Sequence, residues 1–143
     1  MEVRTCTTFD LMNLELQPTQ AHMRDTMTPQ YCRDLLAGGD SFCATVDGYP
    51  IACIGLIHHW ATRKYVWAFL SPSAGRYMLA LTRAVAQWLK YHGAGRIETA
   101  VDCRNAKDIR WAEHLGFVRE GTMRKWTPDG CDVYLYARIG QWP

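Results

Sequence analysis

The apolar positions of the chain follow two periodicities, and these divide it into short strands and short helices. Segments that are apolar throughout, or in which apolar and polar residues alternate, predict β-strands, and apolar residues three or four positions apart predict helices. The predicted strands are residues 2–7, 41–46, 50–57, 64–70, 96–102, 117–125 and 131–139. The predicted helices are residues 9–16, 29–37, 72–92 and 105–115.

Turn and cap residues support these boundaries. Asp47-Gly48 predicts a tight hairpin, because both central positions of such a turn need positive φ angles. Thr28 followed by Pro29 predicts a helix start. Pro18 is expected to end the helix that precedes it.

The order of these elements predicts the fold class. The strand–helix–strand unit of residues 64–102 requires a parallel strand pair with a right-handed crossover. The hairpins on either side of it require antiparallel neighbours. We therefore expect residues 1–143 to form a single α/β (α+β) domain. Its central sheet should be mixed but mostly antiparallel, with about seven strands and with helices on both faces.

Composition and charge narrow the class of protein. The 143 residues suffice for one domain, and a 48% hydrophobic content excludes a disordered chain. The 16 basic and 14 acidic residues give a net charge of +2, which does not indicate nucleic-acid binding. No apolar run reaches the roughly 18 residues of a membrane span, and no secretory leader is evident, so we expect a cytoplasmic protein. The six cysteines include no Cys-x-x-Cys pair and indicate reduced packing residues.

The C-terminal third of the chain carries a family motif. It consists of an asparagine, a Leu-Gly-Phe element and a Glu-Gly pair, namely Asn105, Leu115, Gly116, Phe117, Glu120 and Gly121. Together with the element order, this motif resembles the GCN5-related N-acetyltransferase (GNAT) superfamily. The resemblance implies transfer of an acetyl group from acetyl-CoA to a primary amine of a small molecule or a protein.

The resemblance also implies a binding site for acetyl-CoA. Its residues would lie where strand 64–70 ends and where the last helix starts; they are Phe69, Leu70, Ser71, Gly75, Arg76 and Asn105. Two departures leave catalysis open. The phosphate-binding loop of the family is shortened here to a single glycine, and Ala112 stands where many members have a proton-donating tyrosine. Asn105 fits equally well as the N-cap of its helix, and Arg76 as a surface residue beside a capped helix start.

Two carboxylates are candidates for a catalytic base. Glu98 lies inside its strand, and Asp102 lies at the strand end nearest the implied acyl site. The alternatives are a cross-strand pair of Glu98 with a cation such as Arg138, and a solvated strand-end carboxylate for Asp102. His58-His59 predicts no metal site, because adjacent residues of a strand point to opposite faces.

A second interpretation is a GNAT-like protein that has lost catalysis. The shortened loop, the Gly48-Tyr49-Pro50 strand start and the segment from Arg110 to Phe117 loosely resemble the GNAT-like internal virion proteins of short-tailed bacteriophages. That resemblance implies a structural or host-protein-binding module in the virion or host cytoplasm, with other virion or host proteins as partners. Binding of acetyl-CoA would distinguish the two interpretations.

Overall fold

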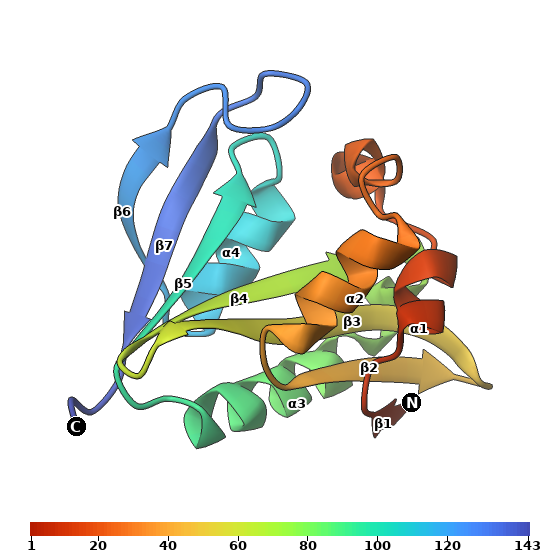
Figure 1. Ribbon diagram of the computed structural model, residues 1–143, viewed down its shortest axis with the longest axis horizontal. Coiled ribbons are helices and arrows are strands. Elements are labelled where there is room, and N and C mark those ends of the chain that lie inside the picture. Colours follow the sequence, from red (N-terminus) through yellow and green to blue (C-terminus); the bar gives the residue numbers. More distant parts are fainter.

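A computed structural model describes all residues from 1 to 143 and shows one seven-stranded sheet (Figure 1). The strands are β1 (Glu2–Arg4), β2 (Ser41–Val46), β3 (Tyr49–Trp60), β4 (Arg63–Leu70), β5 (Arg96–Asp102), β6 (Val118–Met123) and β7 (Val133–Ile139). Their order in the sheet is β1-β2-β3-β4-β5-β7-β6. Every neighbouring pair is antiparallel except β4 and β5, which are parallel. The predicted mixed, mostly antiparallel sheet is confirmed.

Helices cover both faces of this sheet. They are α1 (Thr8–Asn13), α2 (Pro29–Ala37), α3 (Met78–Tyr91) and α4 (Ala106–His114), with 3-10 helices η1 (Pro18–Met23) and η2 (Pro72–Tyr77). In Figure 1, α1 and α2 lie in front of β3 and β4, whereas α3 and α4 lie on the other side. None of these helices combines the length and the apolar character that crossing a bilayer requires.

Several local signals act as expected. Asp47 and Gly48 have φ angles of 51° and 81°, so the β2–β3 hairpin has the tight turn that its sequence predicts. The Thr28 hydroxyl caps α2 by accepting from the Tyr31 N–H at 3.2 Å. The Asn105 side chain caps α4 by accepting from the Asp108 N–H at 3.1 Å.

Two segments differ from the expectation, and both lie beside the site described below. Helix α1 ends at Asn13, short of the predicted end before Pro18, and Pro18 instead begins η1, which places residues 18–23 against β4. Pro72 begins the 3-10 helix η2 and not the long helix, so α3 starts only at Met78. Gly75, a weak helix former, lies in η2.

Two apolar cores lie on opposite faces of the sheet. The first packs Leu81, Val85 and Leu89 of α3 against the sheet, together with Phe117 and the fully buried Tyr136. The second packs α1 and α2 against aromatic residues of β4 and the cysteines of β2 and β3, among them Leu11, Cys32, Cys43, Cys53, Trp67 and Phe69. All six cysteines are free thiols. Much of the aromatic and cysteine content therefore forms the core.

Candidate functional site

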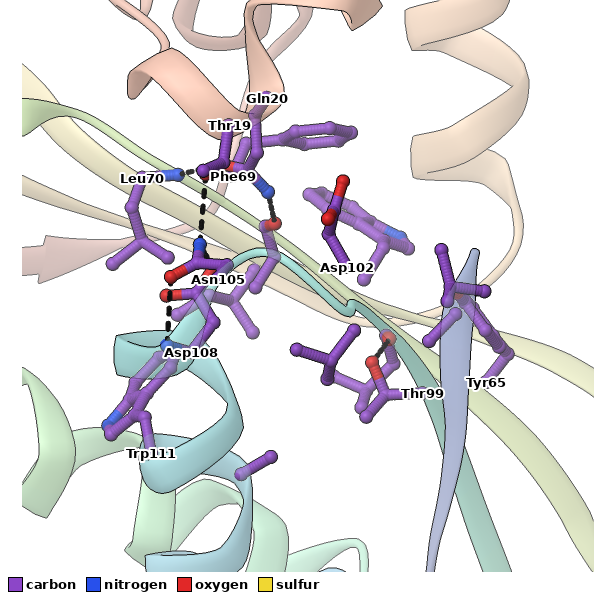
Figure 2. A pocket seen from close by; sticks show the side chains of 18 of the residues that line it. Thr19, Gln20, Tyr65, Phe69, Leu70, Thr99, Asp102, Asn105, Asp108 and Trp111 are labelled. Atoms are coloured by element: carbon purple, nitrogen blue, oxygen red, sulfur yellow. Dashed lines mark hydrogen bonds between the residues drawn. The ribbon is translucent and has the colours of Figure 1, made fainter. Parts of the chain in front are cut away.

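The parallel strands β4 and β5 pair over only part of their length. Their register joins Arg63 with Arg96, and Tyr65 with Glu98, and goes no further. Beyond that point one side-chain hydrogen bond still joins the strands, from the Thr99 hydroxyl to the Val66 carbonyl oxygen at 2.9 Å. The strands then diverge, as Figure 2 shows, and leave an opening in the middle of the sheet.

A cavity of about 350 Å³ fills this opening and reaches both faces of the sheet. On the side of α2, its wall is mostly aromatic and includes Tyr31, Tyr65, Trp67, Phe69 and Trp126. On the side of α3 and α4, its wall is mostly aliphatic and includes Ile54, Val85, Leu89, Ala112 and Phe117. We call these the α2 side and the α4 side. Two small molecules that enter from opposite faces could therefore meet between the strands.

One stripe of helix α4 faces the cavity. It comprises Asn105, Asp108, Trp111, Ala112 and Leu115, which recur at the three- and four-residue spacing of a helix face. The Trp111 indole donates to the Thr82 hydroxyl of α3 at 2.9 Å and so joins the two helices. Ala112 is a small, buried residue that also lines the cavity.

The carboxylate of Asp108 is held by neutral amides. Its Oδ2 accepts from Asn105 Nδ2 at 2.5 Å and from Gln17 Nε2 at 3.0 Å. No lysine, arginine or histidine forms an ion pair with it. Burial raises the pKa of the Asp108 carboxyl, the Gln17 hydrogen bond lowers it, and the charge of Asp102 raises it further; the net shift is upward.

Residues 17–20, which we call the strap, cover the open edge of β4. The Gln20 side chain donates to the Ala68 carbonyl oxygen at 2.7 Å and accepts from the Leu70 N–H at 3.0 Å. The Gln17 N–H donates to the Leu70 carbonyl oxygen at 2.8 Å. Asn105 Nδ2 donates to the Thr19 hydroxyl at 2.9 Å. In Figure 2, dashed lines join Leu70 to Gln20 and Asn105 to Thr19, so the strap bridges β4 and α4.

The predicted base Asp102 lines the cavity, but it is already paired. Its Oδ2 accepts from Arg104 Nη2 at 2.7 Å, and its Oδ1 accepts from the Arg104 N–H at 2.8 Å. The Arg104 side chain holds the pKa of the Asp102 carboxyl below its ordinary value despite partial burial. Asp102 is therefore an ionised group on the α2 side of the cavity.

The structure gives a different environment to the other predicted base, Glu98. This side chain is buried at the base of the opening and does not line the cavity. Its carboxylate accepts from Arg63 Nε at 2.5 Å and from Arg96 Nε at 2.9 Å. The hydrogen bond from Arg63, followed by that from Arg96, lowers the pKa of Glu98 to about 2. Glu98 is thus paired with two cations, Arg63 and Arg96 and not Arg138, which agrees with the alternative to its interpretation as a base.

Three of the six implied coenzyme residues line the cavity, and the other three do not. Phe69, Leu70 and Asn105 line the cavity, and Asn105 also caps α4, as one of its two interpretations predicts. Gly75 and Arg76 are exposed in η2 and lie outside the cavity wall.

Ser71, the remaining member of the implied set, is buried between the cavity and η2. Its hydroxyl accepts from the Ser73 N–H at 3.1 Å and so caps η2. His58 and His59 are exposed near the end of β3, away from the cavity wall. No group of three or more histidine, cysteine, aspartate or glutamate side chains is arranged to hold a metal ion.

The sequence did not identify the polar residues that organise the opening. Gln17, Thr19 and Gln20 lie in a segment without helical or strand periodicity, and their partners are far along the chain. Asp108 stands where the family usually has alanine, and this departure was the only signal for it.

No protein-family model and no curated protein matches the sequence. Ard1 from Thermoplasma volcanium superposes with a TM-score of 0.79 at 18% identity, covering 97% of each chain. The ribosomal-protein-S18-alanine N-acetyltransferase from Escherichia coli gives a TM-score of 0.73 at 20% identity, covering 98% of this chain and 94% of the other.

An N-acetyltransferase from Staphylococcus aureus gives a TM-score of 0.74 at 15% identity, covering 96% of this chain and 97% of the other. At sequence identities this low, the superpositions show a shared fold alone. The chain has the fold of the GNAT superfamily, in a divergent form, and the fold implied by the Asn105–Gly121 motif is confirmed. These comparisons lend no support to the resemblance to phage virion proteins.

Proposed function

We propose that this protein is an N-acyltransferase that moves an acetyl group from acetyl-CoA to a primary amine. The observation that carries the proposal is the divergence of β4 and β5, which opens a cavity to both faces of the sheet. Transfer between two substrates requires that both reach one point, and a cavity with two sides provides this. Several of the proteins with this fold are named as N-acetyltransferases of ribosomal protein alanine or of spermidine.

Most of the residues around the opening fit the coenzyme. When bound, acetyl-CoA supplies an acetyl group activated as a thioester. The β4 edge at Ala68 and Leu70 would hold its arm, and the apolar α4 side would receive the arm's alkyl parts. The residue before α3, Tyr77, makes no side-chain cap, but η2 leads directly into this helix, and the Met78 N–H donates to the Gly75 carbonyl oxygen and is not free. Gly75 has open space around it, and Arg76 is exposed beside it.

One part of the site needs a rearrangement. The carbonyl of Ala68 and the N–H of Leu70 are both bound by Gln20, so they become available to the coenzyme only when the strap moves. The same movement would release Asn105 from Thr19, whereas the bond of Asn105 to Asp108, within α4, would remain. The amine would then approach from the α2 side, where the ionised Asp102 attracts an ammonium group and the aromatic side chains cover its apolar part.

Calorimetry with acetyl-CoA and with free CoA tests this proposal. We expect saturable binding, and at 100 times the dissociation constant a gain in unfolding free energy of about 2.7 kcal/mol. Primary amines, first polyamines and then short peptides, are next screened for acetylation by mass spectrometry. Absence of binding at millimolar acetyl-CoA, both in the wild-type protein and in Gln20→Ala, would show that the proposal is wrong.

The strap also favours a second candidate, a protein that keeps the fold but acts by binding another protein. In that case Gln20 permanently completes the hydrogen bonding of β4, and the cavity is a packing defect beneath the strap. Stable co-purification with a partner, combined with no binding of acetyl-CoA to either variant, would support this candidate.

A further inference from the structure

The cavity wall contains five ionisable side chains, and they differ in where they lie. They are His22, Tyr31, Tyr65, Asp102 and Asp108. Tyr31, Tyr65 and Asp102 belong to the α2 side, and His22 lies in η1. Asp108 is the only one on helix α4, and it faces the α4 side together with Asn105 and Trp111. Asp108 is therefore the ionisable side chain on the α4 side of the cavity, the side from which the coenzyme would enter.

Asp108 also lies close to a small residue of that wall. Ala112 lies one helical turn further along the same face of α4 and is small. The family resemblance implies a tyrosine acid there, which this chain lacks. The Asp108 carboxyl is one turn away on the same stripe, with space in front of it. The helix thus keeps an acidic group on this face but carries it at a different position.

The surroundings of Asp108 suit a group that gains and loses a proton. Both of its hydrogen-bond partners, Asn105 Nδ2 and Gln17 Nε2, donate to the same oxygen, Oδ2. The other oxygen, Oδ1, has no partner and can carry a proton without losing a contact. No cation pairs with the carboxylate, and partial burial raises its pKa. Asp102 adds a second negative charge nearby and shifts that pKa in the same direction.

The other ionisable groups are less suited to this role. Asp102 is bound by Arg104 and stays ionised. Burial raises the pKa of Tyr65 to about 12, so that phenol is a weak acid, and it lies on the α2 side. Burial also raises the pKa of Tyr31. His22 is in η1 and not on α4.

We propose that Asp108 is the proton donor to the departing thiolate in acyl transfer. The step rests on the function proposed above. The ammonium group of the substrate first loses one proton to water, and the neutral amine nitrogen then attacks the thioester carbonyl carbon and forms a tetrahedral adduct. As the adduct collapses, the carbon–sulfur bond breaks and its electron pair stays on sulfur. The Asp108 proton moves to that sulfur, which yields a neutral thiol, an amide and the Asp108 carboxylate. The nitrogen loses its extra proton to water, and water reprotonates Asp108.

The first test measures Asp108 without any coenzyme. Carbon-13 NMR of the aspartate carboxyl groups gives its titration midpoint, with Asp108→Asn used for assignment. We expect a midpoint above the ordinary value of 3.8. Asp34, exposed on α2, serves as the control through Asp34→Asn. A midpoint for Asp108 at or below 3.8 would overturn the inference.

The second test uses the leaving group. With acetyl-CoA, Asp108→Asn should lower kcat by about 10²- to 10⁴-fold, the usual contribution of a general acid, and should leave the affinity for acetyl-CoA unchanged. An acetyl thioester of a nitrothiophenol has a leaving group that needs no proton, so with this donor the variant should regain most of the wild-type rate. Asp108→Glu should keep part of the activity with acetyl-CoA. Asn at this position accepts the same hydrogen bonds, and a thermal melt confirms that the variant is folded.

The outcomes separate this inference from the proposed function. If neither the wild-type protein nor Gln20→Ala binds acetyl-CoA, both are wrong. If the wild-type protein binds and transfers acetyl groups while Asp108→Asn is equally active, the proposed function stands and the inference is wrong. Equal loss of activity with both donors would also overturn it, because that result indicates a structural role.

Discussion

The Gln20 side chain and the Ala68 carbonyl oxygen are joined by a 2.7 Å hydrogen bond at the open edge of β4. The same carboxamide also accepts from the Leu70 N–H, so it binds β4 as a neighbouring strand would. A side chain from a 3-10 helix thus takes positions that β5 leaves when the two strands diverge. Access to this edge depends on whether the strap can be displaced.

Removing the Gln20 carboxamide should tighten the binding of acetyl-CoA. Gln20→Ala frees the edge of β4, so the coenzyme no longer competes with the two hydrogen bonds. We expect the dissociation constant to fall by up to about tenfold, and the unfolding free energy to fall by about 1–2 kcal/mol. Calorimetry and urea denaturation measure these changes. Gln87→Ala, on the exposed face of α3, is the control. Weaker binding in Gln20→Ala would mean that the strap helps to hold the coenzyme.

Gly55 on β3 is required by the packing of Trp67. A Cβ at position 55 would lie 2.2 Å from Cζ2 of the indole, so the ring must move away from the strand. The Trp67 Nε1–H is buried without a hydrogen-bond partner, and packing alone holds the ring in place. Gly55→Ala should therefore lower the unfolding free energy by about 1–3 kcal/mol and change the tryptophan fluorescence.

A matched control for this variant is Gly75→Ala. A Cβ at position 75 meets nothing within 4 Å, and the backbone there does not require glycine. This substitution should be neutral or should stabilise the protein by about 0.4–1 kcal/mol, because it restricts the unfolded chain. Equal destabilisation by both substitutions would contradict the proposed packing of Trp67 on Gly55.

The Glu98 ion pairs should make stability depend on pH in the acidic range. The pKa of Glu98 is about 2 in the folded protein, below its ordinary value of 4.5. The stabilisation is therefore complete above pH 4.5 and is lost as the pH falls from 4.5 towards 2. The Glu98 ion pairs contribute about 2–3 kcal/mol to the unfolding free energy, since the Glu98 side chain is buried.

Glu98→Gln tests this dependence. The variant should be less stable than the wild type at pH 7, and the difference should shrink as the pH falls to 3. Urea denaturation at a series of pH values measures it. Glu15→Gln, at an exposed position, should follow the wild-type profile. A difference that stays constant with pH would mean that the ion pairs to Arg63 and Arg96 do not stabilise the fold.

The hydrogen bond between Trp111 and Thr82 should stabilise the contact between α3 and α4. Thr82→Val keeps the shape of the side chain but leaves the indole N–H without an acceptor, at a cost of about 1–3 kcal/mol. A double-mutant cycle with Trp111→Phe should give a coupling energy of about 1 kcal/mol. A coupling energy near zero would show that the two helices are held by apolar packing alone.

Local patterns in the sequence predicted most of the fold. Alternation predicted the strands, Asp47-Gly48 predicted the hairpin turn, and Asn105 was correctly expected to cap α4. The strand–helix–strand unit predicted that β4 and β5 are parallel. These features depend on residues that are close in the chain, where periodicity and cap chemistry act directly.

The candidate site was predicted only in outline. Phe69, Leu70 and Asn105 do line the cavity, because the resemblance located the strand end and the helix start. Gly75 and Arg76 were expected at the start of the long helix. They lie in the 3-10 helix η2, because α3 begins only at Met78.

The sequence by itself determined the elements, their order and the parallel pair at the centre of the sheet, since each of these has a short-range signature. The tertiary structure alone decided which polar groups meet in the opening. Gln20 binds Ala68, Gln17 binds Asp108 and Arg63 binds Glu98 across long stretches of chain. A hydrogen bond or an ion pair between distant residues leaves no periodic trace, because only the folded backbone brings its two partners together. The same contacts left Glu98 ionised between two arginines and left Asp108 with a raised pKa in the cavity wall.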